Sequence, residues 1–335
     1  MSDKPFFAMP YPGIFRVTCT VPFPGLKIVH VYITEGPNGG LVVIDSSLGY
    51  EDSWARIEQG VRWLDRELTD IETIYLTHAH PDHFGLCREL QEASGAPVVC
   101  HPIAREHMLE MAGGPERMRT SFDRYVEHGW APDDDMMQMP GGRSTMSSMS
   151  MGVPERMETI EEGARVTFGG GDWDVYWTPG HEHGHIVFLR PSDDVILVGD
   201  TLLGRITPHI GWYGEPEDPL GHFMDSLTRL EQLAPAFVLP GHGRSFEDGA
   251  ARARSIRNHH RDRLRRCVES LGRRGPSNAL SVTHDVFDRD LMVFEERMAM
   301  SEVLSHLEYL RLRGRLVREM HDGTWLYAMP ESVIP

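Results

Sequence analysis

Hydrophobic and polar positions change their spacing several times along the first 130 residues, and each change predicts a new element. Short runs rich in Val, Ile, Tyr and Phe predict strands, some joined by turns, at 14–34, 41–45, 72–77 and 96–101. Apolar residues at helical spacing predict helices at 51–68, 84–93 and 102–128. Because strands and helices alternate, we expect an α/β fold in which helices cover sheets.

The same kind of pattern continues in the second half of the chain. Apolar runs predict strands at 164–168, 173–178, 185–190, 195–199 and 236–240, and a helix at 219–233. The stretch 132–157 between the halves has no period and is rich in Met, Ser, Gly and Pro, so it predicts a long loop. Its methionine-rich part, 136–157, would form either a pliable lid over an acyl chain or a mobile insertion.

The character of the chain changes after about residue 250. Helical spacing predicts an arginine-rich helix at 251–274 and two further helices at 277–287 and 295–313. RLVREM, the turn HDG and TWLYAM then predict a β-hairpin. Three helices and a hairpin suggest a small winged-helix-like appendage, so we predict two domains, 1–250 and 251–335.

Composition narrows the class of protein. The 335 residues carry a net charge of −17, which disfavours nucleic acids and anionic membranes as partners. The four cysteines form no CxxC pair, so neither a disulfide framework nor a cysteine-based zinc site is expected. No secretory signal and no apolar run long enough for a membrane span is found. We therefore expect a cytoplasmic protein that acts on a small molecule, and a homodimer is possible.

Metal-ligating residue types gather where predicted strands end. THAHPDHFG (77–85) follows a strand, and the later strands stop at TPGH, GD and PGH. These motifs supply seven potential ligands: His78, His80, Asp82, His83, His181, Asp200 and His242. Seven are too many for one catalytic zinc ion and suit two ions that share a bridge. His78 and His80, two residues apart in an extended segment, point the same way, whereas Asp82 and His83 turn toward a second ion.

The four motifs, in this order and spacing, resemble the metallo-β-lactamase fold hydrolases over about residues 14–250. The C-terminal part resembles the glyoxalase II-like or lactamase-beta-like subgroup, which ends in a winged-helix-like segment. The resemblance implies an αββα sandwich. It also implies the roles of the ligands: His78, His80 and His181 for the first metal, Asp82, His83 and His242 for the second, and Asp200 as the bridge. Asp45, after an early strand, would orient ligands through hydrogen bonds.

These residues predict a hydrolase with two divalent cations, zinc first and iron or manganese as alternatives. A metal-bridging hydroxide would attack an ester, lactone or thioester, with Asp82 and Asp200 as the catalytic carboxylates. Zinc β-lactamases commonly have a cysteine in the second metal site. No cysteine lies between His181 and His242 here, so the resemblance disfavours antibiotic hydrolysis. A further candidate near the site is His185, which could support a ligand. Trp212 and Tyr213 could either line the substrate pocket or pack beneath a loop.

Two other classes of function are alternatives to a small-molecule hydrolase. An RNA-processing nuclease could use the same metal site, and the arginine-rich helix at 251–274 is the feature that favours it. The acidic chain as a whole argues against it, and we expect those arginines to be paired internally or at a dimer contact. Related di-iron redox proteins usually carry Glu in place of a first-motif histidine, whereas this chain keeps His80.

Overall fold

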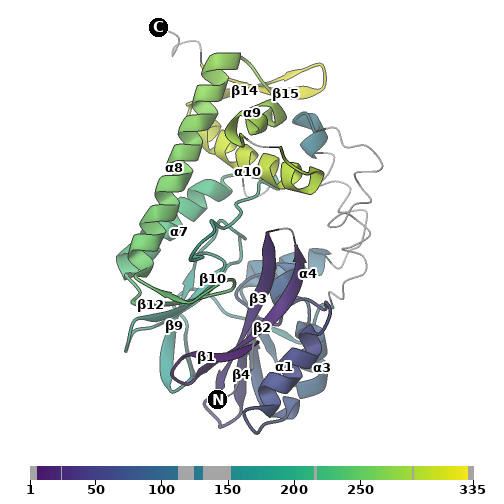
Figure 1. Ribbon diagram of the computed structural model, residues 1–335, viewed down its shortest axis with the longest axis vertical. Helices are drawn as coiled ribbons and strands as arrows, with labels where there is room; N and C mark the ends of the chain where they lie inside the picture. The colour runs from purple at the N-terminus through teal and green to yellow at the C-terminus, as the bar shows by residue number, and fades with distance from the viewer. Residues whose placement is uncertain are drawn as a thin grey trace.

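The computed structural model describes residues 6–23, 25–111, 124–130, 152–214, 217–288 and 290–330. Two β-sheets face each other, helices cover the outer face of each, and a smaller helical part follows at the C-terminal end (Figure 1). The predicted αββα sandwich is confirmed.

The first sheet has its seven strands in chain order. They are β1 (Phe7–Tyr11), β2 (Ile14–Phe23), β3 (Leu26–Glu35), β4 (Leu41–Ile44), β5 (Ile71–Tyr75), β6 (Val98–Cys100) and β7 (Met157–Thr159). The strands from β1 to β4 pair antiparallel, whereas those from β4 to β7 pair parallel. The ends of β4 and β5 therefore lie at one edge, where open α/β sheets place their sites.

The second sheet has six strands in the order β13-β12-β11-β10-β9-β8. They are β8 (Arg165–Phe168), β9 (Gly171–Trp177), β10 (Ile186–Arg190), β11 (Val195–Gly199), β12 (Phe237–Pro240) and β13 (Phe246–Glu247). Only β11 and β12 pair parallel, so both of these strands end at the same edge. The inner faces of the two sheets share one core, in which Tyr32 and Ile44 of the first meet Trp173 and Phe188 of the second.

Helices bury the outer faces of both sheets. The first sheet packs against α1 (Ser53–Arg62), α3 (Cys87–Ser94) and α4 (Pro102–Met111), and the second against α7 (Pro219–Leu233) and the first half of α8 (Gly249–Arg274). Ile57 of α1, Leu90 of α3 and Phe223 of α7 are fully buried in these contacts. Burying one such side chain stabilises the fold by about 1.5–3 kcal/mol.

The C-terminal part consists of helices and a hairpin, as predicted. The second half of α8 packs with α9 (Ala279–Val286), α10 (Val293–Leu312) and the antiparallel pair β14 (Val317–His321) and β15 (Thr324–Ala328). Figure 1 shows α8 running from beside the second sheet to this hairpin, so the helix contacts both parts of the molecule. The domain boundary at residue 250 stays a prediction.

Several predicted elements need correction. The helix predicted at 51–68 ends at Arg62, because Asp65 has a left-handed φ of 55° and the chain then forms the short 3-10 helix η1 (Leu68–Asp70). The helix predicted at 84–93 is preceded by a separate helical turn, α2 (Pro81–Phe84), which replaces part of the expected loop. Strand β1 was not predicted, since it is a short edge strand containing Pro10.

Two predicted segments lie partly or wholly beyond what the structure describes. Of the helix predicted at 102–128, residues 102–111 form α4, residues 124–127 are helical, and 112–123 lie outside the described residues. Residues 136–151 of the methionine-rich segment also lie outside them. Among the described helices, none is long and apolar enough to span a membrane.

Candidate metal centre

The seven sequence-predicted ligands meet at the shared edge of the two sheets. The histidines and aspartate of the HxHxDH motif follow β5, and His181, Asp200 and His242 follow β9, β11 and β12. Proline explains the shape of the motif. Pro81 holds His80 in an extended conformation (φ −81°, ψ 143°) and starts the helical turn α2. His78 and His80 therefore lie on an extended segment, whereas Asp82 and His83 lie on a helix.

The first group of facing side chains consists of His78, His80 and His181. His80 Nδ1 lies 3.1 Å from His78 Nε2 and 2.9 Å from His181 Nε2. Burial lowers the pKa of His80 to about 3, with repulsion from His181 as the second cause. Burial likewise lowers the pKa of His78 well below its usual value. These imidazoles are therefore neutral at physiological pH and present lone pairs to one another.

The second group consists of Asp82, His83 and His242. The Nε2 atoms of His83 and His242 lie 3.3 Å apart, and His242 Nε2 lies 3.3 Å from Asp82 Oδ2. Burial lowers the pKa of His242, but Asp200 and Asp82 outweigh it and raise that pKa to about 10. Burial raises the pKa of Asp82, but the hydrogen bond with His242 and the charge on His83 bring it down to about 2.

Asp200 lies between the two groups. Its Oδ2 is 3.5 Å from His181 Nε2 in the first group and 3.2 Å from His242 Nε2 in the second. Its Oδ1 is 3.5 Å from His83 Nε2 and, although buried, has no hydrogen-bond partner within the part of the chain that the structure describes. Burial raises the pKa of Asp200, but His242 and His83 lower it far more, so the carboxylate is ionised.

The tautomers suit metal ligation. His78, His83, His181 and His242 each have an outward Nδ1–H that donates, respectively, to Thr77 Oγ1, Asp45 Oδ2, the His209 carbonyl and the Ile28 carbonyl. Their Nε2 atoms consequently face the interior of the cluster, as the ligating nitrogen of a metal-bound histidine does. The three imidazoles of the first group are neutral, whereas the effect of burial is outweighed by the carboxylates, which raise the pKa of His83 and of His242, so these two would each release a proton when a cation binds. With the ionised carboxylates they form a donor set that fits divalent cations.

Asp45 contacts the centre through hydrogen bonds with His83 and Thr77. Asp45 Oδ1 accepts the Thr77 N–H at 2.8 Å, and Oδ2 accepts from His83 Nδ1 at 2.7 Å. Thr77 Oγ1 donates to Asp45 and accepts from His78, so a single carboxylate orients one histidine of each group. Asp45 has a left-handed φ of 61°, a conformation that is uncommon outside glycine and often found at functional sites.

His185 lies beside the ligands without facing the interior of the cluster. Its ring stacks on His78 with centroids 4.7 Å apart, and its Nε2 accepts the backbone N–H of Asp200 at 3.1 Å. Its Nδ1 is within 3.0 Å of the Thr178 and Thr201 hydroxyls. The geometry therefore gives His185 the position of a support for Asp200.

His30 was missed by sequence reasoning, and Gly241 was recognised only as a turn residue. His30 Nε2 donates to the Gly243 carbonyl at 2.6 Å, and its backbone N–H donates to the Gly241 carbonyl, which together fix the loop that carries His242. A Cβ at Gly241 would lie 2.5 Å from Asp200 Oδ1, so only glycine fits. The PGH motif marked this glycine as a turn residue, whereas nothing in the pattern distinguished His30 from a core histidine.

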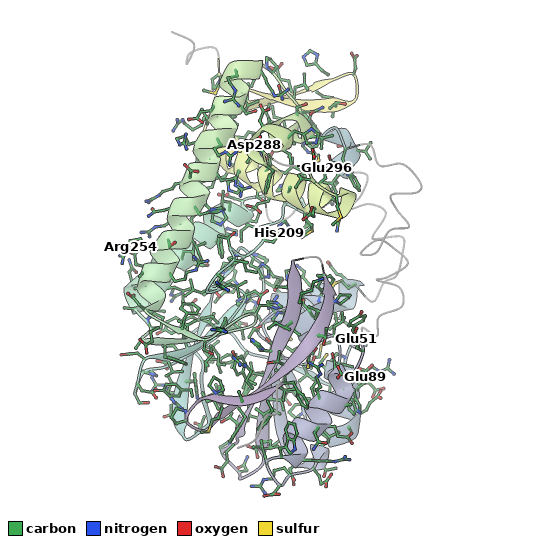
Figure 2. The ribbon with its side chains drawn as sticks, viewed as in Figure 1. Glu51, Glu89, His209, Arg254, Asp288 and Glu296 are labelled. Atoms are coloured by element: carbon green, nitrogen blue, oxygen red, sulfur yellow. The ribbon has the colours of Figure 1, made fainter. Side chains whose placement is uncertain are left out.

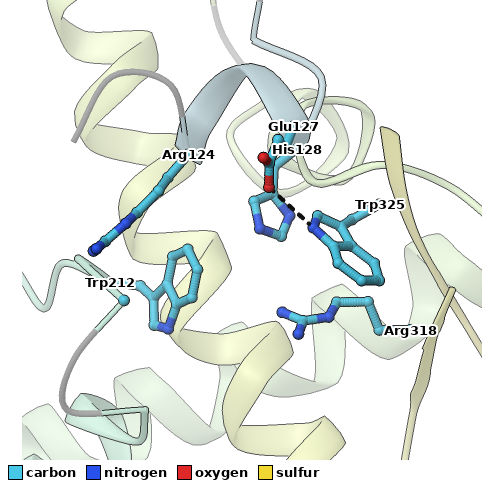
Figure 3. Close-up of a pocket in the computed structure, with 7 residues that line it drawn as sticks. Arg124, Glu127, His128, Trp212, Arg318 and Trp325 are labelled. Atoms are coloured by element: carbon cyan, nitrogen blue, oxygen red, sulfur yellow. Dashed lines mark hydrogen bonds between the residues drawn. The ribbon is translucent and has the colours of Figure 1, made fainter. Parts of the chain in front are cut away.

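Trp212 and Tyr213 contact the C-terminal part and the segment 124–130. The backbone N–H of Trp212 donates to the Ser301 carbonyl, and its ring packs edge-on against His128. Trp212 lines a cavity of about 300 Å³, whereas Tyr213 is 42% exposed and its carbonyl accepts from Arg124. Figure 3 shows the labelled side chains of that cavity: Arg124, Glu127, His128, Trp212, Arg318 and Trp325.

Comparison with known proteins agrees with this geometry. A family model described as the metallo-beta-lactamase superfamily matches residues 24–242, and one described as a metallo-beta-lactamase-like C-terminal domain matches 264–330. A probable metallo-hydrolase of Bacillus subtilis (strain 168) is 26% identical over 318 residues, which cover 92% of this chain and 96% of that protein. A hydroxyacylglutathione hydrolase of Idiomarina loihiensis is 30% identical over 189 residues, which cover 55% of this chain and 49% of that protein.

A solved structure extends the likeness to nearly the whole chain. The crystal structure of a metallo-beta-lactamase family protein from Thermus thermophilus superposes with a TM-score of 0.82 at 28% identity, covering 96% of this chain and 99% of that one. The fold, the buried cluster of His and Asp, and these likenesses define a metal-dependent hydrolase. The chain belongs to the metallo-β-lactamase superfamily, and the resemblance seen in its four motifs is confirmed.

Proposed function

We propose that this hydrolase is binuclear and that it cleaves a small-molecule ester, lactone or thioester. The observation that carries the proposal is the position of Asp200, whose carboxylate faces His181 of one group and His242 of the other. Two groups of three ligands that share a carboxylate supply enough ligands for two cations, and more than a single cation binds.

Each of the seven residues has a role in this proposal. His78, His80 and His181 would hold the first cation, Asp82, His83 and His242 the second, and Asp200 both. Zinc suits His and carboxylate ligands, with iron or manganese as alternatives. When bound, two divalent cations lower the pKa of water and polarise the scissile carbonyl. Asp82 and Asp200, both ionised, are the groups of the chain placed to take up the proton that the attacking water loses.

The substrate class is supported by the relatives and by charge. The relative from Idiomarina loihiensis is named as a hydrolase of an acylated glutathione, which favours an acyl thioester over other small molecules. A net charge of −17 disfavours a polyanionic substrate. The buried ligands accordingly favour a small molecule over RNA.

The arginine-rich helix, the feature that favoured a nuclease, finds partners within the chain. Arg252 donates to the Leu203 and Ile206 carbonyls. Further pairs are Arg254 and Arg257 with Glu231, Arg263 with Glu302, Arg265 with Asp262 and Glu269, and Arg273 and Arg274 with Asp285. Figure 2 shows Arg254 on the outer side of α8. Positive charge that is neutralised locally offers little to a phosphate backbone.

The test combines metal analysis with a substrate panel. Metal content per chain is measured, and acyl thioesters, lactones, simple esters and RNA are assayed with the wild type, Asp200→Ala and Asp174→Ala. Asp174 of β9 pairs with Arg165 of β8 and serves as the matched control. Loss of a residue that only supports a metal ligand lowers metal affinity or activity by roughly 10–100-fold. Removing the shared ligand Asp200 should therefore lower kcat/KM by more than about 100-fold. Equal activity of Asp200→Ala and the wild type would refute the mechanism, and RNA cleavage alone would refute the substrate class.

A further inference from the structure

The ligand His181 depends on a segment that has no regular structure of its own. Its Nδ1 donates to the His209 carbonyl at 2.8 Å, and this bond keeps His181 Nε2 free to face the cluster. Residues 201–214 form neither helix nor strand. The position of the His209 carbonyl must therefore be set by contacts that the segment makes with the rest of the molecule.

Close to His209, the contacts come from α10, whereas Arg252 of α8 holds the earlier part of the segment. Ser305 Oγ, fully buried, donates to the Ile210 carbonyl at 2.7 Å, and the Trp212 N–H donates to the Ser301 carbonyl at 3.2 Å. Glu302 places its Oε2 3.9 Å from His209 Nδ1. Figure 2 shows His209 between α10 and the strands of the sandwich.

Glu302 is part of a buried polar group that lies apart from the metal centre. His260, Glu302 and His306 come within 4.8 Å of one another, as metal ligands would. However, Arg263 Nη1 lies 3.7 Å from Glu302 Oε1 and already supplies positive charge.

The two histidines of this group are hydrogen-bonded to each other, although His260 Nε2 has no hydrogen-bond partner among the described residues. His306 Nδ1 donates to the Glu302 carbonyl at 2.6 Å, and its Nε2 accepts from His260 Nδ1 at 3.1 Å. Burial raises the pKa of Glu302, but His209 and Arg263 outweigh it, so the carboxylate stays ionised. The group therefore anchors the segment, and we do not assign it a third cation.

We propose that Ser305 and Glu302 are positioning residues for His181, because they hold the segment whose carbonyl orients that imidazole. The inference rests on the proposed function, since it takes His181 as a metal ligand. Through these contacts the C-terminal part of the chain sets the metal affinity of the first group and leaves the second group unaffected.

The full-length chain is stripped of metal and titrated with Zn²⁺ against a chromophoric chelator, so that two binding steps are resolved. The variant His181→Asn identifies the step that belongs to the first group. We expect Ser305→Ala and Glu302→Gln to weaken that same step by roughly threefold to tenfold. Loss of a residue in direct contact with a metal ligand lowers metal affinity by roughly 10–100-fold. The smaller effect is expected because Ser305 and Glu302 contact the segment that holds His181, and not His181 itself. The other step should be unchanged.

Glu308→Gln is the matched control. Glu308 is a buried carboxylate of the same helix, and its partners are Arg311 of α10 and Arg318 and Tyr327 of the hairpin. The inference is overturned if both steps of Ser305→Ala and Glu302→Gln equal those of the wild type. It is also overturned if Glu308→Gln weakens the first step equally, because general loosening of α10 would then explain the effect. Either variant alone carries the test if the other does not fold. A wild type that binds no pair of ions refutes the proposed function and this inference with it.

Discussion

Replacing Asp45 with asparagine tests how a carboxylate behind the ligands controls the centre. The substitution is nearly isosteric, and asparagine tolerates the left-handed φ of 61° at this position. Both oxygens of Asp45 accept hydrogen bonds, Oδ1 from the Thr77 N–H and Oδ2 from His83 Nδ1. An amide has only one oxygen, so its NH₂ must face one of these two donors.

Each orientation of the amide has a distinct cost. If the NH₂ faces Thr77, a buried backbone N–H loses its acceptor, which destabilises the fold by about 1–3 kcal/mol. If it faces His83, that imidazole must move its proton from Nδ1 to Nε2, where the second cation would bind. The same 1–3 kcal/mol then weakens metal binding by roughly 5- to 150-fold. We expect the loss to be divided between stability and affinity for the second ion.

The assay measures both quantities on the same samples. Urea unfolding of metal-free protein gives the free energy of unfolding, and chelator competition gives the two dissociation constants. Asp174→Asn, a carboxylate-to-amide exchange on β9, serves as the control and should change neither. If Asp45→Asn keeps both the stability and the affinity of the wild type, Asp45 does not orient His83 and the reasoning fails.

Two further predictions concern Gly241 and Tyr327. Gly241→Ala should abolish binding of at least one ion, as measured by metal content, because its Cβ would lie 2.5 Å from the Asp200 carboxylate. The control is Gly272→Ala on α8, where a Cβ would meet open space. This variant should bind metal normally and unfold at a higher urea concentration, because alanine favours a helix more than glycine does. Burial and the neighbouring Glu308 raise the pKa of Tyr327 well above its usual value of about 10, so its stabilisation is present below that pH and is lost as the pH rises above it. Tyr327→Phe should therefore be less stable than the wild type at neutral pH, and the gap in unfolding free energy should narrow above pH ~10; a constant gap would contradict the assigned shift.

The fold and the ligand cluster were predictable because their signals are local and strong. Buried strands read as continuous apolar runs, and each motif stands directly after one of them, as His181 does in TPGH and Asp200 in GD. Because strand ends share an edge of the sheet, residues far apart along the chain are expected to meet there. The extended placement of His78 and His80 also followed from their spacing.

The supports of the ligands were harder to predict for physical reasons. His209 acts through its backbone carbonyl, and every residue has one, so no side-chain pattern identifies it. His30 lies on a strand and is buried, and the sequence pattern does not distinguish such a histidine from an ordinary core residue. The early end of α1 depends on a left-handed Asp65, which helix periodicity does not encode. For Trp212 the sequence left pocket lining and packing beneath a loop as alternatives, because its contacts, with His128 and Ser301, involve residues more than 80 positions away along the chain.

The ligands are contributed by both sheets: the HxHxDH motif comes from the first, and His181, Asp200 and His242 come from the second. Bound cations would therefore act as a cross-link between the two halves of the sandwich at this edge, in addition to the apolar core that the sheets share. A ligand that binds only the docked sheets stabilises them in proportion to the logarithm of its concentration over its dissociation constant. Starving a cell of metal would then lower the abundance of this protein as well as its turnover.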